Sequence, residues 1–150
     1  MPSIGALSDY SGLFMRKGNL IMINNSGSGK YNKTRVGRFG EDIAIKFFES
    51  RDIKIIKRNY FTKFGEIDLI GIENKTIIFI EVKLRFDRSF GAPFESIDQK
   101  KWEKLQKSAE MFLIENDFLD KECRFDMLSL LYSDVYKSFK VEWLKNQIFY

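Results

Sequence analysis

The stretch "FGEIDLIGIENKTIIFIEVKLRF", residues 64–86, is among the most apolar runs of the chain, yet Glu66, Asp68, Glu81 and Lys83 lie within it. A charge inside an apolar strand costs free energy unless it is paired, exposed or bound to a metal. The stretch therefore has to fold so that its apolar residues are buried while these four side chains keep a polar environment.

An antiparallel hairpin that turns at Asn74 meets this requirement, because Asn tolerates the positive φ of a tight two-residue turn. In that register Asp68 lies opposite Glu81, and Glu66 lies opposite Lys83. The four charges then share one face, at the end of the hairpin away from the turn. The other face is wholly apolar and carries Ile67, Leu69, Ile78, Ile80, Val82 and Leu84. A slip of one residue would break that apolar face.

Two carboxylates directly opposite each other on a sheet repel, with their Cβ atoms about 5 Å apart. A hard divalent cation such as Mg²⁺ is the simplest reason to place them there, because it binds carboxylate oxygens, water and phosphate. Lys83 lies on the same face as Glu81 and could hold a phosphate or orient a water molecule. The structural alternative is that Glu66 and Lys83 form a cross-strand ion pair, while Asp68 and Glu81 lie at an exposed end of the sheet.

The chain contains no histidine, which excludes Ser-His-Asp hydrolases, Cys-His proteases and histidine-based zinc sites. Its net charge of +4 is compatible with nucleic acid as a partner. No apolar run approaches the roughly 20 residues needed to span a membrane. The lone Cys123 has no disulfide partner within the chain. We therefore expect a cytoplasmic protein without membrane contact.

Helical spacing of apolar residues predicts helices over Thr34–Ser50 and Glu95–Asn116. The middle strands are so apolar that we expect helices on both faces of a mixed sheet, and hence an α/β domain. The predicted strands are "IKIIKRNY" from Ile53, "EIDLIGI" from Glu66, "TIIFIEVKLR" from Thr76, "RFDMLSLLY" and "KVEWLK".

Residues 1–32 differ from the rest, because they lack a periodic apolar pattern and end in "NNSGSGKYN". We expect a flexible N-terminal extension there, or a start codon assigned upstream of Met15 or Met22. The folded domain is then residues 33–150.

The motifs "GEIDLI", "FIEVKLR", "KWEKLQKSAEMFL", "CRFD" and "VEWLK" occur in the order found in the YraN family of small bacterial proteins. The chain resembles that family from about Gly37 to its C-terminus. YraN proteins are similar to archaeal Holliday-junction resolvases. The resemblance implies a restriction-endonuclease-like αβββαβ core of the PD-(D/E)xK type, with a Mg²⁺-dependent nuclease site that would also accept Mn²⁺. Related resolvases are dimers, so the resemblance also implies a homodimer.

Carried over residue by residue, Asp68 matches the first motif carboxylate, while Glu81 and Lys83 match the E-x-K element. Glu41 matches the acidic residue of the first helix, and Lys101 matches a lysine at the start of the second. The proline that often precedes the motif Asp is absent, with Ile67 in its place. Asp68 and Glu81 are the metal ligands that this match implies, with the Val82 carbonyl as a third candidate.

Seven residues receive less specific assignments. Lys101 either contacts a DNA phosphate or is an ordinary solvated helix lysine. Arg85 and Arg88 either contact the DNA backbone or are exposed loop arginines. We expect Asp126 to make a structural bond, Phe125 and Trp143 to be core residues, and Glu66 to pair with Lys83 or Arg85.

The sequence thus predicts a metal-dependent endonuclease acting on DNA, with branched or junction DNA as the substrate that the resemblance suggests. Glu41, Asp68, Glu81 and Lys83 are its catalytic candidates, and Arg85 and Lys101 its substrate-binding candidates. The alternative is a nucleic-acid-binding or scaffold protein that keeps the fold without turnover.

Overall fold

The computed structural model describes residues 13–16, 19–22, 33–85, 98–133 and 138–147 of the chain. From α1 onward the elements follow the αβββαβ order that the resemblance implies, with one more strand at the end. In chain order they are β1 (Leu13–Arg16), β2 (Asn19–Met22), α1 (Lys33–Glu49), β3 (Lys54–Phe61), β4 (Glu66–Glu73), β5 (Thr76–Arg85), α2 (Gln99–Glu115), β6 (Cys123–Ser133) and β7 (Ser138–Leu144).

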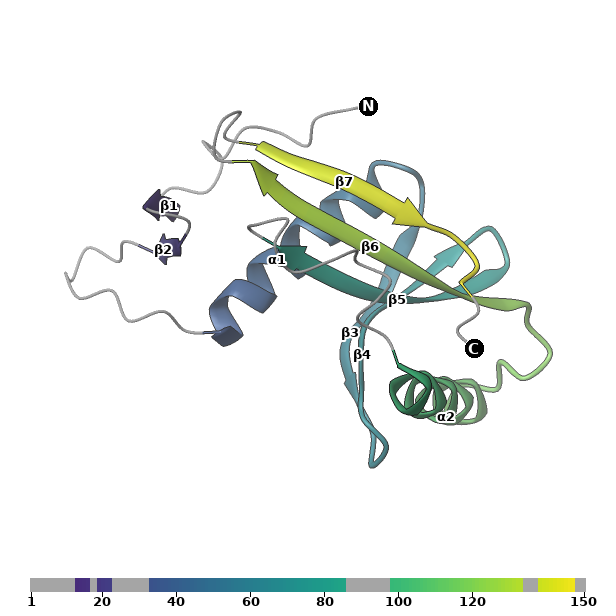
Figure 1. Ribbon diagram of the computed structural model, residues 1–150. Coiled ribbons are helices and arrows are strands. Elements are labelled where there is room, and N and C mark those ends of the chain that lie inside the picture. The colour runs from purple at the N-terminus through teal and green to yellow at the C-terminus, as the bar shows by residue number, and fades with distance from the viewer. Residues whose placement is uncertain (1–12, 17–18, 23–32, 86–97, 134–137, 148–150) are drawn as a thin grey trace.

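A five-stranded sheet with the order β3-β4-β5-β6-β7 forms the centre of the domain (Figure 1). β5 and β6 run parallel, whereas the other neighbouring strands run antiparallel. A parallel pair needs a crossover connection, and α2 lies on the chain segment that joins β5 to β6. The sheet is therefore mixed, as predicted.

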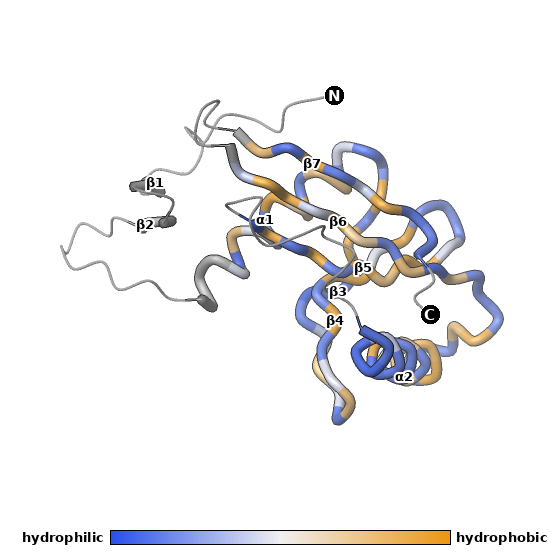
Figure 2. The backbone as a smooth tube through the Cα atoms, in the orientation of Figure 1, coloured by the Kyte–Doolittle hydropathy of each residue, from blue (hydrophilic) through white to orange (hydrophobic). Residues whose placement is uncertain are grey.

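The two helices cover opposite faces of this sheet, which confirms the prediction made from its apolar strands. α1 buries Ile43 and Phe48 in one hydrophobic cluster, and α2 buries Trp102 and Phe112 in another. Alternate residues of β5 enter the two clusters in turn, Ile78 and Ile80 on the α1 side and Ile77 and Phe79 on the α2 side. Figure 2 shows hydrophobic residues along the central strands and hydrophilic ones at the hairpin turns.

α2 begins at Gln99 rather than at Glu95, because Asp98 caps it in an extended conformation. The Asp98 Oδ1 accepts a hydrogen bond from the Lys101 backbone N–H at 2.8 Å, which satisfies one of the free donors of the first turn. The expected helical residues 95–97 lie outside the described part of the chain. Within that part, both helices fall short of the length and apolarity needed to cross a membrane.

The hairpin of β4 and β5 has the predicted register over its outer half. Asn74 adopts a φ of 55° at the turn, and the paired residues run from Glu73–Thr76 to Leu69–Ile80. The pairing ends there. The predicted ladder pairs Asp68–Glu81 and Glu66–Lys83 are therefore wrong, because the two strands separate before reaching them.

The faces of β4 switch at Asp68, which corrects the prediction that Ile67 and Leu69 share one apolar face. Leu69 packs in the α1 cluster, whereas Ile67 packs in the α2 cluster. On β3, the residues paired with these two flank Asn59, whose φ is 51°. A left-handed residue reverses the strict alternation of a strand, and spacing in the sequence does not reveal it.

Within residues 1–32 the structure describes β1 and β2, which pair antiparallel in a separate two-stranded sheet. This hairpin was not predicted. Whether residues 1–32 are dispensable for the fold of residues 33–150 stays a prediction.

Candidate functional site

Asp68 lies where β4 and β5 separate, a position that we call the fork. Its Oδ2 accepts a hydrogen bond from the Val82 backbone N–H at 2.8 Å, in place of a bond between the two backbones. On its other edge, β5 stays paired with β6 as far as Arg85. The fork therefore opens between β4 and β5 alone and brings Asp68 beside the second half of β5.

Glu41 reaches the same place from the middle of α1 and is only 8% exposed. Its Oε2 accepts hydrogen bonds from Arg58 Nε at 2.8 Å and from Asn59 Nδ2 at 3.0 Å. Arg58 also donates to Asp42 Oδ1 at 2.6 Å and to the Arg38 carbonyl at 2.9 Å. The carboxylate of Glu41 is thus fixed by two donors from β3.

Arg58 and Asn59 were missed as site residues by the sequence reasoning. The available signal was an Arg-Asn pair in the strand-like run "IKIIKRNY", because Asn is depleted from strands and tolerates positive φ. The Arg-Asn pair can be recognised as part of the site only when α1 is known to lie across β3, and the local sequence does not show this.

Glu41, Glu66 and Asp68 bring carboxylate oxygens within 4.8 Å of one another. Burial raises the pKa of Asp68 to about 8, with further contributions from Glu81 and Glu41, although the Val82 hydrogen bond and Lys101 oppose the shift. Partial burial, Glu41 and Glu81 also raise the pKa of Glu66. Negative charge at the fork is therefore in excess, and an all-oxygen group of this kind could hold a hard cation.

Glu81 belongs to a second group, in which two lysines neutralise it. The residue is 8% exposed, and its Oε1 lies 3.1 Å from Lys83 Nζ and is also bonded by Lys101 Nζ. Burial lowers the pKa of Lys83, Lys101 lowers it further, and Glu81 opposes the shift. Burial alone would lower the pKa of Lys101, but Glu81 outweighs it and the pKa is raised. Lys83 thus pairs with Glu81, not with Glu66 as expected.

The structure therefore brings Glu41, Asp68, Glu81, Lys83 and Lys101 to one end of the sheet, and adds Glu66 to the acidic side. Arg85 ends β5, and its Nε is buried without a hydrogen-bond partner among the described residues. Arg88 lies outside those residues.

Asp126, Phe125 and Trp143 have the structural roles that the sequence predicted. The carboxylate of Asp126 accepts hydrogen bonds from Arg124 Nε at 3.0 Å, Trp143 Nε1 at 3.0 Å and Asn146 N at 2.9 Å. The rings of Trp143 and Phe125 pack edge-on against core aromatic rings.

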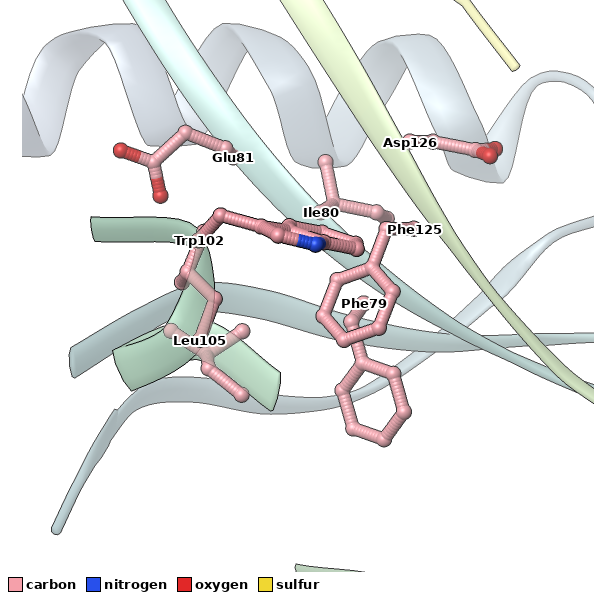
Figure 3. A pocket seen from close by; sticks show the side chains of 8 residues that line it. Phe79, Ile80, Glu81, Trp102, Leu105, Phe125 and Asp126 are labelled. Carbon is pink, nitrogen blue, oxygen red and sulfur yellow. The ribbon is translucent and has the colours of Figure 1, made fainter. Parts of the chain in front are cut away.

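A small pocket lies beside Glu81 on the α2 side of the sheet (Figure 3). Its walls are mostly apolar and include Trp102, Leu105, Phe79 and Phe125. Figure 3 shows Glu81 at its edge, with the carboxylate pointing away from the rings. The pocket is thus continuous with the α2-side core, and the polar chemistry lies at the fork above it.

The sequence model of the family described as "Uncharacterised protein family UPF0102" matches residues 40–130. A UPF0102 protein of Sulfurihydrogenibium sp. is 43% identical over 99 residues, which cover 66% of this chain and 86% of the relative. UPF0102 proteins of Dictyoglomus turgidum and Fusobacterium nucleatum are 36% and 38% identical over 115 residues, which cover 77% of this chain and 98% and 92% of theirs. The family match spans every candidate site residue from Glu41 to Lys101.

Proposed function

Because the chain belongs to the uncharacterised family UPF0102, the YraN family that its motifs resemble, we propose from its own site that it is a metal-dependent endonuclease acting on DNA. The proposal rests on the meeting of two groups at the fork, one made of carboxylates and one in which lysines surround Glu81. A half-buried carboxylate with a raised pKa, Asp68, stands beside the buried Glu41, while Glu81 and Lys83 stand on the adjacent strand. Gathering partly buried carboxylates with too few cationic partners is costly for a purely structural element.

The donor set fits a hard divalent cation, because it consists of carboxylate oxygens and the raised pKa of Asp68 marks charge that a cation would offset. Asp68 and Glu81 are the ligands that the motif implies, and the structure adds Glu41 and Glu66 as carboxylates within reach of Asp68. When bound, Mg²⁺ would polarise a phosphodiester and acidify a water molecule.

The residues of the chain would perform the remaining tasks. Lys83, whose pKa is lowered, would orient the attacking water and stabilise charge that develops on the phosphate. Lys101 would contact a phosphate after leaving Glu81, and Arg85, at the end of β5, would contact the DNA backbone. Arg58 and Asn59 hold Glu41 and so position it without touching the substrate.

The test is a cleavage assay with linear, flapped and four-way DNA, in Mg²⁺, in Mn²⁺ and in EDTA. We expect cleavage that depends on metal and is lost in Asp68→Asn, Glu81→Gln and Lys83→Met. Lys83→Met should keep DNA binding better than cleavage. Glu103→Gln is the matched control, because Glu103 is an exposed α2 carboxylate that bonds Gln99 rather than the fork. Cleavage that survives Asp68→Asn would contradict the assigned site.

One observation favours the alternative of a non-catalytic nucleic-acid-binding or scaffold protein. Glu81 is already neutralised by Lys83 and Lys101, so this half of the fork needs no cation. The same assay separates the two functions: a scaffold binds DNA but leaves every substrate intact in Mg²⁺ and in Mn²⁺.

A further inference from the structure

The turn between β3 and β4, residues 62–65, extends past the rest of the sheet beside α2 (Figure 1). Hydrogen bonds within the turn and to α2 hold it in place. The Thr62 hydroxyl accepts hydrogen bonds from Phe64 N at 3.0 Å and Gly65 N at 3.2 Å, and it lies 2.7 Å from the buried hydroxyl of Ser108 on α2. Gly65 has a φ of 156°, which a side chain would disfavour. The turn is therefore a fixed projection.

Phe61 stands at the base of this turn with 71% of its surface exposed. It pairs with Glu66 across β3 and β4, so their Cβ atoms are about 5 Å apart. Its neighbour Tyr60 is buried in the α2 cluster, so Phe61 points to the opposite face. An exposed aromatic ring on a braced turn thus lies next to the acidic group at the fork.

The α2 side of the same turn is basic. Lys63 and Lys107 place their Nζ atoms 5.2 Å and 5.6 Å from the centre of the Phe64 ring. The stem of Lys104 lies against Gly65, and Lys100 continues the row along one face of α2. Among the described residues, none of these exposed lysines forms an ion pair. Positive charge gathered without partners is complementary to a row of phosphates.

We propose that the turn is a binding site for the boundary between duplex and unpaired DNA. The lysine row would hold the phosphates of one strand, and Phe61 would stack on the first unpaired base beside the fork. Stacking on an aromatic ring tolerates any base, and lysine contacts to phosphates are likewise independent of sequence. This inference rests on the proposed action on DNA and narrows its substrate to DNA with a flap or branch.

The test measures binding of the full chain in EDTA, so that cleavage does not enter. Fluorescence anisotropy compares a flapped DNA with a blunt duplex of the same sequence. We expect Phe61→Ala to weaken binding of the flapped DNA about tenfold and that of the duplex by less than about twofold. Phe61→Trp should retain the preference for the flap. Leu119→Ala is the matched control, because Leu119 is a similarly exposed apolar residue, at 67%, beyond the end of α2.

The lysines should behave differently from Phe61. Lys63→Ala and Lys107→Ala should weaken binding of both DNAs alike, and each should reduce the slope of log affinity against log salt by about one. The stacking site would be overturned by a Phe61→Ala variant that binds the flapped DNA as tightly as wild type. It would also be overturned if the variant lost the same factor of affinity for both DNAs.

The results also separate this inference from the proposed nuclease activity. A flap preference that needs Phe61, in a protein that never cleaves, keeps the binding site and removes the nuclease. Cleavage by a protein whose binding of the flapped DNA is unchanged in Phe61→Ala keeps the nuclease and removes the binding site. Wild-type protein that binds neither DNA and cleaves no substrate in Mg²⁺ or Mn²⁺ overturns both.

Discussion

At the scale of single residues, the most consequential group is the carboxyl of Asp68, because its pKa of about 8 couples its proton to folding. In an unfolded chain an Asp titrates near pH 4. Between about pH 4 and about pH 8 the folded protein holds a proton that the unfolded chain has lost. Stability without metal therefore falls as pH rises through this window, by at most about 1.4 kcal/mol per pH unit from this group.

Asp68→Asn removes this dependence while keeping the size of the side chain. Without metal, we expect the variant to be as stable as wild type or more so, with an advantage that grows from pH 5 to pH 8. Urea denaturation of both proteins in EDTA at several pH values measures it. An advantage that stays constant from pH 5 to pH 8 would show that Asp68 is already ionised in the folded state.

Added Mg²⁺ should reverse the order of the two proteins. A ligand that binds only the folded state stabilises it by RT ln(1 + [L]/Kd), so a Kd of roughly 1 mM and about 10 mM Mg²⁺ give on the order of 1.4 kcal/mol. The Asn variant, with one ligand charge removed, should gain much less. Melting curves with EDTA and with Mg²⁺ compare them, and equal shifts would mean that Asp68 is not a ligand.

Asn59 contributes to the fork through both its backbone conformation and its side chain. Its φ of 51° is costly for Ala, by about 1–2 kcal/mol, but not for Gly. We therefore expect Asn59→Ala to lower the free energy of unfolding more than Asn59→Gly, which loses only the hydrogen bond to Glu41. Chemical denaturation of the two variants would measure the difference. Equal losses would mean that the backbone conformation at this position contributes little.

At the scale of elements, α1 offers two glycines in contrasting positions. A Cβ added at Gly40 would lie 3.2 Å from the Cβ of Leu84 on β5, whereas one at Gly37 would meet nothing within 4 Å. The close approach at Gly40 lets the helix lie against β5, one residue before Glu41, which enters the fork.

We expect Gly37→Ala to stabilise the protein by about 0.5–1 kcal/mol, because Ala restricts the unfolded chain and favours the helix. Gly40→Ala should show none of this gain, because α1 and Leu84 must move apart. Denaturation midpoints of both variants test the pair, and an equal gain would mean that the contact between α1 and β5 yields easily.

At the scale of the whole molecule, the two-stranded sheet of β1 and β2 shares no strand with the five-stranded sheet. The core clusters of the described residues begin at Phe39. Deletion of residues 1–32 should therefore leave the melting temperature nearly unchanged. Thermal unfolding of the full and shortened chains measures this, and a fall of many degrees would show that the N-terminal segment packs on the domain.

Apart from β1 and β2, the local sequence was sufficient for the elements and for most of the hairpin of β4 and β5. Alternation and turn chemistry act between near neighbours, so they predicted β4 and β5, the turn at Asn74 and the pairs as far as Leu69–Ile80. Runs of apolar residues likewise predicted helices on both faces of a mixed sheet. The motifs also identified most of the residues that the structure brings together at the fork, but not Arg58 or Asn59.

Only the tertiary structure decided how those charges are partnered. Asp68 leaves the ladder to bond Val82, the positive φ of Asn59 lies opposite the point where the faces of β4 switch, and Glu81 meets Lys101. Each depends on a strand separation or on a helix arriving from a distant part of the chain. Electrostatic and hydrogen-bond partners are set by distance in space, which spacing along one strand does not determine.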